Sequence, residues 1–322
     1  NTIWLWRADQ STLVLPGMFL RATADPLHQK LAVIESTSTG PLLAYWSPSS
    51  GLVGASPIPN SSSNQFRIDW QSEGNALLIN ELNPAGKIWW SKLDAGQPFV
   101  DVLPQASYYW SENILRGSDS SFLYQIDPAT RKFLQTQKSL GIVDATKNLT
   151  LQTTSTGILL KERSLSTRLF ALPSGQWNFG DLEQFYILLH DHDHWLAMDT
   201  ASPPYAEQLT GDHPRWLMGS EPLSALFVND GEVWMWQMGK TPALLWRQSE
   251  PIQEVDWHRS GTSVFIADQH HLFALELDDR NGRQITQLAD FDQIRDFGLI
   301  GKSLFIAGTK NGISGLWKIE IE

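Results

Sequence analysis

Short apolar runs alternate with polar turn residues along the whole chain. Eight of these runs align at a spacing of about 35 to 40 residues, with one longer interval after the first, where the Ser-rich stretch Pro57–Asn64 lies. The aligned runs are Lys30–Glu35, Ala76–Asn80, Asn113–Arg116, Leu149–Thr153, Tyr186–Leu189, Ala225–Val228, Ser263–Ala267 and Ser303–Ala307. Runs of this length between turn residues predict β-strands.

A second apolar run follows each of the first eight. The second runs are Pro41–Trp46, Lys87–Leu93, Phe122–Ile126, Ile158–Glu162, Trp195–Met198, Val233–Gln237, Leu272–Leu277 and Leu316–Ile321. The residues between the two runs, such as Asn229-Asp230-Gly231 and Lys310-Asn311-Gly312, tolerate positive φ and predict hairpin turns. The best helix candidate, Gly180–Leu189, falls where the repeat predicts a strand.

A fixed pattern of side chains precedes several of the aligned runs. It consists of an acid, an aromatic residue, a glycine four residues later and an aliphatic residue after that; a looser copy lacks the glycine. The copies are Asp69, Trp70 and Gly74; Asp256, Trp257 and Gly261; Asp296, Phe297 and Gly301; and, without glycine, Tyr109 and Trp110. One small strand unit repeated in this way indicates an array of units that bury their apolar faces against one another.

These observations predict an all-β fold, a β-propeller of eight four-stranded blades in one domain over residues 1–322. Seven blades is the alternative, if the weak region Leu140–Trp177 or the first blade is misassigned. The chain ends on a third strand, and its first residues contain two short strand candidates, Ile3–Arg7 and Thr12–Leu15. Because a shared blade removes exposed sheet edges, we expect residues 1–16 to complete the last blade.

The composition agrees with a strand-rich fold and excludes several functions. The chain has 322 residues, of which 15 are Trp, and Trp favours strands and contacts between sheets. Its net charge of −11 and its lack of basic runs disfavour direct binding to a nucleic acid backbone. The absence of Cys excludes disulfides, thiolate metal ligands and a cysteine nucleophile.

The termini and the hydropathy bear on cellular location. No apolar run reaches the roughly 18 residues that a transmembrane helix needs, and no signal peptide is evident. Because the chain starts at Asn1 rather than at Met, we expect a signal, an anchor or a whole domain to lie upstream.

Two segments resemble the repeats of a known family. Trp70-Gln71-Ser72-Glu73-Gly74 and Trp257-His258-Arg259-Ser260-Gly261 resemble the aromatic residue and Ser-Pro-Asp-Gly of WD40-like repeats in TolB-type periplasmic proteins, although Ser-Pro-Asp-Gly itself is not intact here. Similar propellers form the extracytoplasmic sensor region of some ToxR/CadC-type transcriptional regulators. The resemblance implies a periplasmic or otherwise extracytoplasmic location and a role in binding; it is an analogy of fold.

The most unusual local sequence is His190-Asp191-His192-Asp193-His194. On a strand, His190, His192 and His194 would share one face and could bind a metal ion. The repeat instead places Asp191-His192 in the turn between the second and third strands, equivalent to Asp268-Gln269, with the pair His270-His271 beside that second turn. We therefore interpret the cluster as a solvated turn, with metal binding as the alternative.

The repeated acids Asp69, Asp256 and Asp296 have two interpretations. They could form a ring of carboxylates at a catalytic or cation site. An acid at the same point of each repeat more often accepts backbone N–H groups at a tight turn, and this structural interpretation is preferred. The aromatic residues that follow are expected to form the core between blades.

No motif for a specific chemistry is present. The chain lacks a Gly-x-Ser-x-Gly elbow, a phosphate-binding glycine loop and a His-Glu-x-x-His motif, so no catalytic residue and no cofactor is predicted. The favoured hypothesis is a non-enzymatic propeller that binds a protein or a small ligand at one rim or at the channel mouth. The alternatives are a hydrolase or lyase with its site in the central channel, and a structural element of a longer regulator.

Overall fold

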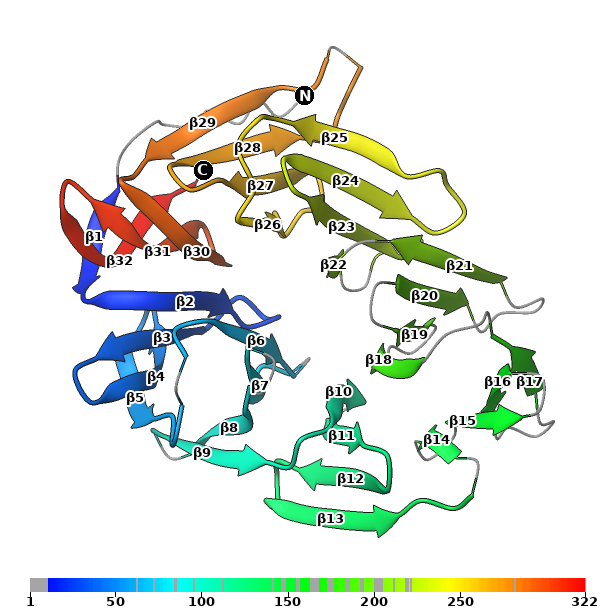
Figure 1. The fold of residues 1–322 in the computed structure, drawn as a ribbon. Coiled ribbons are helices and arrows are strands. Elements are labelled where there is room, and N and C mark those ends of the chain that lie inside the picture. Colours follow the sequence, from blue (N-terminus) through cyan, green and yellow to red (C-terminus); the bar gives the residue numbers. More distant parts are fainter. Residues whose placement is uncertain are drawn as a thin grey trace. The chain divides into compact units, whose positions relative to one another are not determined.

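The computed structural model describes residues 11–322 apart from short gaps. Residues 1–10, 62, 72, 84–85, 95, 112, 141, 146–148, 155–156, 163–167, 173–176, 183–185, 192–193, 200–204, 211, 218–219, 221, 281 and 322 lie outside the described part. The described residues contain 32 strands and no helix (Figure 1). The prediction of an all-β chain is therefore confirmed.

The chain divides into two compact units. Unit 1 comprises Asn1–Leu103 and His213–Glu322, and unit 2 comprises Pro104–Asp212. The prediction of one domain over residues 1–322 stays a prediction.

Unit 1 contains five sheets of four strands, in the orders β2-β3-β4-β5, β6-β7-β8-β9, β22-β23-β24-β25, β26-β27-β28-β29 and β1-β32-β31-β30. Its strands are β1 (Thr12–Pro16), β2 (Met18–Ala24), β3 (Leu31–Thr37), β4 (Gly40–Ser47), β5 (Gly51–Pro57), β6 (Phe66–Trp70), β7 (Ala76–Glu81), β8 (Ile88–Asp94), β9 (Gln97–Leu103), β22 (Asp212–Leu217), β23 (Ser224–Asn229), β24 (Glu232–Gln237), β25 (Ala243–Arg247), β26 (Glu254–Trp257), β27 (Ser263–Ala267), β28 (His271–Glu276), β29 (Ile285–Asp290), β30 (Gln293–Ile300), β31 (Ser303–Lys310) and β32 (Ile313–Glu320).

Unit 2 contains one sheet of eight strands, in the order β13-β12-β11-β10-β18-β19-β20-β21, and one of four, β14-β15-β16-β17. Its strands are β10 (Ser107–Ser111), β11 (Ile114–Ser118), β12 (Phe122–Asp127), β13 (Lys132–Gln137), β14 (Ile142–Ala145), β15 (Leu149–Thr154), β16 (Gly157–Glu162), β17 (Arg168–Ala171), β18 (Asn178–Leu182), β19 (Tyr186–His190), β20 (His194–Asp199) and β21 (Tyr205–Thr210).

All eight predicted second strands are present, and so are the third strands that follow them. The segment Gly180–Leu189 belongs to strands β18 and β19, as the repeat required. The strands nevertheless form seven sheets, because a parallel bridge between Ser111 and Leu182 joins β10 to β18 and so merges two four-stranded groups. When each hydrogen-bonded sheet is counted as one blade, the structure has seven blades, which was the alternative to the expected eight. The expectation of eight separate blades is not supported.

The two ends of the described chain share a sheet. Strand β1 pairs antiparallel with β32, with Thr12 opposite Lys318 and Pro16 opposite Gly315. This confirms that the N-terminal segment completes the last sheet; the strand candidate Ile3–Arg7 lies outside the described residues. In this sheet β32 lies between β1 and β31, so the pairing with β1 prevents β32 from being an exposed edge strand.

The repeated glycine forms the turn between the first and second strands. Gly74 and Gly301 have φ of +65° and +60°, which side chains with a Cβ rarely adopt. At Gly74 a Cβ would also lie 2.5 Å from Oδ2 of Asp25, which follows β2 in the turn before β3. The repeated glycine therefore marks a tight turn, and at Gly74 that turn also packs closely against the turn between β2 and β3.

The core of unit 1 lies between the faces of successive sheets. Trp46 of β4 packs on Phe305 of β31, with ring centroids 4.5 Å apart. Phe265 and Phe297 belong to one buried cluster formed by the sheets that start with β26 and β30. Aromatic side chains fill the space between twisted sheets, so the high Trp and Phe content has a structural cause.

Unit 2 has its own core of the same kind. Tyr109 of β10 packs on Phe179 of β18 with ring centroids 5.6 Å apart, and Trp177 and Leu160 are buried in the same cluster. The eight-stranded and the four-stranded sheet of unit 2 thus bury a common apolar layer.

Candidate functional site

The acid and the aromatic residue of the repeat signature lie on the first strand of three sheets. Asp69 and Trp70 end β6, Asp256 and Trp257 end β26, and Asp296 lies inside β30. The three acids are therefore strand residues, and the expectation that they sit at tight turns is wrong. The turn comes later, at the glycine, because the hairpin needs positive φ there.

The two signature tryptophans tie neighbouring sheets together. Nε1 of Trp70 donates to the carbonyl of Thr23 on β2 at 3.2 Å, and Nε1 of Trp257 donates to the carbonyl of Arg215 on β22 at 2.8 Å. Each indole thus reaches the first strand of the preceding sheet. These contacts support the expected structural role of the aromatic residues between sheets.

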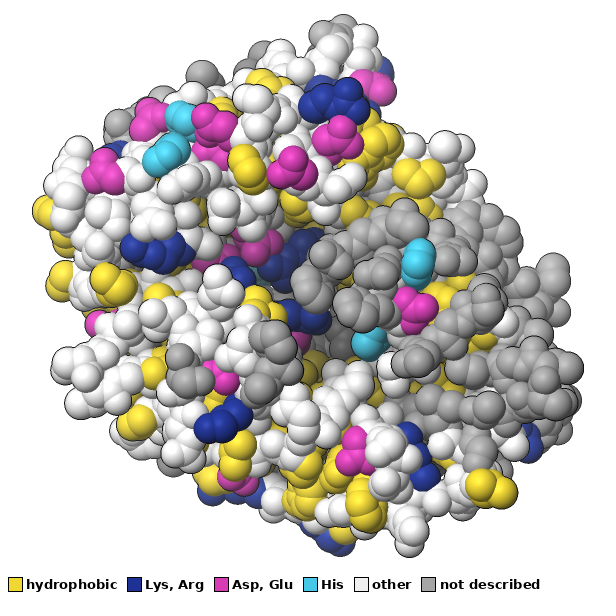
Figure 2. Space-filling view, in the orientation of Figure 1, with side chains coloured by type: hydrophobic (Ala, Val, Ile, Leu, Met, Phe, Trp, Pro, Cys, Tyr) yellow, Lys and Arg dark blue, Asp and Glu magenta, His cyan; other side chains and the backbone are white. Residues whose placement is uncertain are grey.

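The first strands of four sheets bring charged side chains together in unit 1. We call Arg21 of β2, Arg215 of β22, Glu254 and Asp256 of β26, and Asp296 of β30 the arginine–carboxylate cluster. Figure 2 shows Lys or Arg and Asp or Glu side chains lying next to one another on this face.

Glu254 lies between the two arginines of the cluster. Its Oε1 accepts hydrogen bonds from Nη2 and Nε of Arg215 at 2.7 and 2.9 Å. Its Oε2 lies 3.9 Å from Nη1 of Arg21, which is also 3.6 Å from Oδ2 of Asp296. Glu254 therefore links β26 to both β22 and β2.

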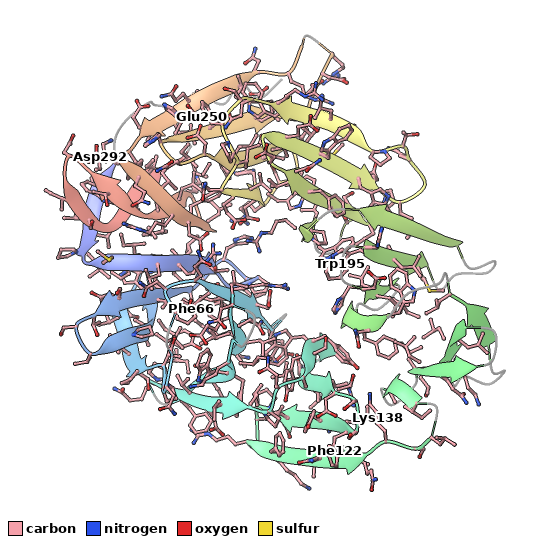
Figure 3. All side chains as sticks on the ribbon, viewed as in Figure 1. Phe66, Phe122, Lys138, Trp195, Glu250 and Asp292 are labelled. Atoms are coloured by element: carbon pink, nitrogen blue, oxygen red, sulfur yellow. The ribbon has the colours of Figure 1, made fainter. Side chains whose placement is uncertain are left out.

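Arg21 also connects β2 to the sheet that follows it. Its Nε donates to the carbonyl of Phe66 at 2.5 Å, and Phe66, labelled in Figure 3, begins β6. A single guanidinium thus contacts three neighbouring first strands. Its planar set of donors suits such a junction better than the single ammonium of a lysine.

Asp296 is held by backbone groups. Its Oδ2 accepts the N–H of Ala22 at 3.0 Å, and its Oδ1 accepts the N–H of Phe297 at 2.9 Å. Its side chain is only 3% exposed. The preferred expectation that the repeated acids accept backbone N–H groups is met at Asp296, and at Asp256, whose Oδ1 accepts the N–H of Trp257 at 2.8 Å.

Burial shifts the pKa values in the cluster. Loss of hydration raises the pKa of Asp296 to about 6, even though the charge of Arg21 opposes the shift, and Glu254 adds to it. Loss of hydration also raises the pKa of Asp256, against the charge of Arg215. The negative charge of Glu254 raises the pKa of Arg215, which stays protonated. The pKa of the Asp296 carboxyl therefore lies well above that of an ordinary Asp.

A second ion pair lies on the first strand β6. Nε of Arg67 donates to Oδ1 of Asp69 at 2.8 Å, and Nδ2 of Asn80 donates to Oδ2 at 3.4 Å. Arg67 stands two residues before Asp69, as Glu254 stands two residues before Asp256. Residues two apart on a strand lie on the same face, so this spacing could have indicated from the sequence that the two side chains are close together. No comparable spacing marks Arg21 or Arg215.

The structure describes part of the histidine-rich segment. His190 ends β19 and His194 begins β20, and the N–H of Asp191 donates to the carbonyl of His194 at 3.0 Å, so the predicted hairpin position is confirmed. Nδ1 of His194 lies 3.5 Å from Oδ1 of Asp191. His192 lies outside the described residues, and metal binding by this segment stays a prediction.

The hairpin between β27 and β28 is equivalent to the hairpin between β19 and β20. It contains Asp268 and His271, which are three residues apart in the sequence. Oδ1 of the buried Asp268 accepts the N–H groups of His270 and His271, both at 2.7 Å. Nδ1 of His271 lies 3.1 Å from both oxygens of Asp268. Burial alone would raise the pKa of Asp268, but these hydrogen bonds hold it below its usual value.

Among the described residues, Glu250, Asp268 and His271 have ligand atoms that all lie within 4.8 Å of one another (Glu250 is labelled in Figure 3). The oxygens of Asp268 already accept hydrogen bonds from the turn and from Nε2 of Gln248 at 3.3 Å. The carboxylate therefore has a structural role in this hairpin. The sequence had indicated the turn that contains Asp268 and His271, but not that Glu250 lies close to these two residues.

Three solved structures share this fold over nearly the whole chain. Sqt1 of Saccharomyces cerevisiae aligns with a TM-score of 0.55 at 10% identity, covering 96% of this chain and 98% of that chain. The Cps50 (Swd1) β-propeller domain of Myceliophteria thermophila aligns with a TM-score of 0.56 at 10% identity, with the same coverage. A chain of the Mitotic Checkpoint Complex aligns with a TM-score of 0.51 at 12% identity, covering 99% and 94%.

Two observations decide the architecture. The alignments with these structures cover nearly the whole chain, and most of its sheets consist of four strands that follow one another in the sequence. The chain has the fold of a WD40-type β-propeller. At identities of 10–12% the likeness shows the fold alone. No protein-family model and no curated protein sequence matches the chain.

The finer resemblance to TolB-type proteins and to the sensor regions of ToxR/CadC-type regulators stays a prediction. Within the described residues, no helix has the length and apolarity needed to cross a bilayer.

Proposed function

We propose that this protein is a non-enzymatic binding propeller and that a protein partner contacts unit 1 at the first strands that carry its charged side chains. The fold supports the proposal, because rigid sheets present side chains and loops in fixed positions. One of the similar chains comes from the Mitotic Checkpoint Complex, a multi-protein assembly by its name.

The observation that carries the proposal is that the arginine side chains on these first strands are more exposed to solvent than the carboxylates paired with them. The side chains of Arg21, Arg67 and Arg215 remain 26%, 36% and 38% exposed. Glu254 and Asp296, which lie against Arg21 and Arg215, are 11% and 3% exposed, and Asp69, which lies against Arg67, is 21% exposed. Each arginine is thus held by a less exposed carboxylate, while part of its own side chain remains accessible to solvent.

This arrangement suits a partner that offers oxygen acceptors. A guanidinium held by one carboxylate still has N–H donors for a second acceptor, such as a backbone carbonyl or a carboxylate of a bound segment. Preorganised arginines are also frequent among residues that contribute most to protein interfaces. We therefore expect the partner to contact Arg67 and Arg215 through a polar or acidic segment.

A binding assay with matched arginine variants tests the proposal. Full-length protein is applied to an array of defined peptides that includes acidic, neutral and basic sequences. We expect Arg67→Gln to weaken the retained peptides about tenfold, which corresponds to about 1.4 kcal/mol. Arg280→Gln is the control, because Arg280 is an exposed arginine paired with Asp278 in a turn.

Two results would contradict the proposal. One is binding of no peptide above background by the wild-type protein. The other is an equal loss of binding in Arg67→Gln and Arg280→Gln, which would indicate a general charge effect.

An enzyme of the hydrolase or lyase class is the second candidate, and one observation favours it. A carboxyl group with a pKa raised to about 6 beside a second carboxylate is a common arrangement of catalytic acids. Both oxygens of Asp296 accept backbone N–H groups, however, and its side chain is almost fully buried. Hydrolysis or elimination activity that disappears in Asp296→Asn, with binding to peptides unchanged, would favour the enzyme.

The extracytoplasmic location and the sensor role within a larger regulator remain part of the proposal. They rest on the resemblance of the repeats to TolB-type and ToxR/CadC-type proteins. A fusion of the complete gene product to a reporter that is active in only one compartment tests the location. Activity on the cytoplasmic side of the membrane would contradict it.

A further inference from the structure

Strand β13 differs from the other strands at sheet edges. It is the fourth strand of its group, at one end of the eight-stranded sheet, and within the described part of the chain it pairs only with β12 (Figure 1). All six of its residues, Lys132–Gln137, are exposed. The fourth strands β5, β9, β25 and β29 each contain at least one buried residue.

The direction of the backbone groups of β13 follows from one hydrogen bond and the register. The N–H of Lys138 donates to the carbonyl of Ser121 at 2.9 Å, and the register continues this pairing as Phe122 opposite Gln137. Bonded and non-bonded pairs alternate along an antiparallel ladder. Phe133, Gln135 and Gln137 therefore direct their N–H and C=O groups away from β12, where they face solvent.

The side chains of β13 are unusual for an unprotected edge. Phe133 and Leu134 are 43% and 41% exposed and lie on opposite faces of the strand. Edge strands are commonly protected by lysine, by proline, by a bulge or by a covering segment. The segment Lys132–Gln137 has a lysine at its first position only and no proline, and its register with β12 is regular.

The charge of this segment is opposite to that of the whole chain. Residues 131–143 include Arg131, Lys132 and Lys138 and no acid, whereas the chain as a whole has 35 acidic and 24 basic residues. Asp119 and Asp127 lie close to it on the β12 side, so the local balance remains positive by one charge. Such an edge attracts an acidic strand more than a basic one.

A second copy of this chain fits the edge poorly. If two β13 strands paired antiparallel around Gln135, Lys132 of each would face Lys138 of the other. Like charges directly opposite each other destabilise a strand pair. A partner with acidic ends avoids this repulsion.

We propose that β13 accepts an extended segment of a partner protein as an additional antiparallel strand, with apolar residues at alternate positions and Asp or Glu at its ends. The outward N–H and C=O groups of Phe133, Gln135 and Gln137 supply the ladder hydrogen bonds. Phe133 and Leu134 supply apolar contacts, and Lys132 and Lys138 face the acidic ends. This site lies in unit 2 and goes beyond the proposed function, which concerns unit 1.

The test uses two labelled peptides and two variants of the same residue. The probe is a fluorescent peptide of alternating Val and Thr with Glu at both ends, and the control peptide has Lys at both ends. Gln135→Pro removes an outward N–H but leaves the hydrogen bonds to β12 in place, and Gln135→Ala keeps the N–H. We expect the Glu-ended peptide to bind the full chain at least about tenfold more tightly than the Lys-ended peptide. We expect this binding to fall about tenfold or more in Gln135→Pro and to persist in Gln135→Ala.

Hydrogen exchange keeps the test independent of any folding defect in the proline variant. In the wild-type protein, the Glu-ended peptide should slow exchange of the Phe133, Gln135 and Gln137 amides, while Leu134 and Thr136, which pair with β12, should change little. Equal binding by Gln135→Pro and Gln135→Ala, equal binding of both peptides, or slowed exchange elsewhere only would overturn the proposal. Concentration-dependent dimerisation that protects the same amides without peptide would identify a second copy as the occupant instead. Arg67→Gln should leave this binding unchanged, which separates it from the proposed function.

Discussion

The arginine–carboxylate cluster of unit 1 and strand β13 of unit 2 distribute polar and apolar side chains in opposite ways. In the cluster, charged residues lie on first strands, where Asp296 is almost fully buried and each acid has a hydrogen-bond partner. On β13, apolar residues lie on an edge and remain exposed. The first strand β2 contacts β6 and β30 of neighbouring sheets, whereas among the described strands β13 has only β12 as a hydrogen-bonded neighbour.

The difference shows at which strands the packing of the sheets restricts the choice of side chain. A charge on a first strand needs a partner, because burial without one is strongly unfavourable. On β13, Phe133 packs on Tyr124 of β12 with ring centroids 5.9 Å apart, yet Phe133 and Leu134 remain 43% and 41% exposed. Apolar side chains exposed on an edge strand are available for contact with another molecule.

The largest expected effect compares the same substitution in the two regions. Phe265 of β27 is fully buried in the core between sheets, and Phe133 of β13 is exposed. We expect Phe265→Ala to lower the free energy of unfolding by about 3–5 kcal/mol and Phe133→Ala by about 1 kcal/mol or less. Urea unfolding followed by Trp fluorescence measures both. Equal losses would mean that β13 is packed as firmly as the core.

Removing the central acid of the cluster should have the next largest effect. Glu254→Gln leaves Arg215 and Arg21 without their shared carboxylate, and because both guanidiniums are partly exposed we expect a loss of about 1–2 kcal/mol in unfolding free energy. Glu250→Gln, at an exposed position, should change it by about 0.5 kcal/mol or less. If thermal unfolding shows the two variants equally affected, the cluster does not stabilise the junction of the first strands.

The smallest expected effect is a dependence on pH that distinguishes Asp296. Burial raises the pKa of its carboxyl from 3.8 to about 6 in the folded protein. The group therefore adds stability that is fully present below the unfolded value and lost as pH rises through about 6. Relative to Asp296→Asn, the wild-type protein should gain about 1 kcal/mol between about pH 7 and about pH 5. Parallel pH profiles of the midpoint of urea unfolding in the two proteins would contradict this.

The alternation of apolar runs and turn residues was sufficient to predict the strands. All eight second strands and the completion of the last sheet by Thr12–Pro16 followed from the sequence, because hairpin turns and short buried strands have local signatures. The number of sheets did not follow, since the bridge between Ser111 and Leu182 joins strands separated by about two repeats.

The candidate site was predicted only in part. Asp256 and Asp296 were singled out by their place in the repeat, and Glu254 could have been found two residues before Asp256. Arg21 and Arg215 could not, because they reach Glu254 from other sheets and no local pattern marks either arginine.

The sequence alone determined the all-β class, the repeat, the turns that need glycine and the anionic character of the chain. Only the tertiary structure decided which charges are paired, which carboxyl has a raised pKa and which edge strand stays uncovered. The physical reason is that strand formation depends on neighbours along the chain. Ion pairing and burial depend instead on the neighbours in space that packing of the sheets provides.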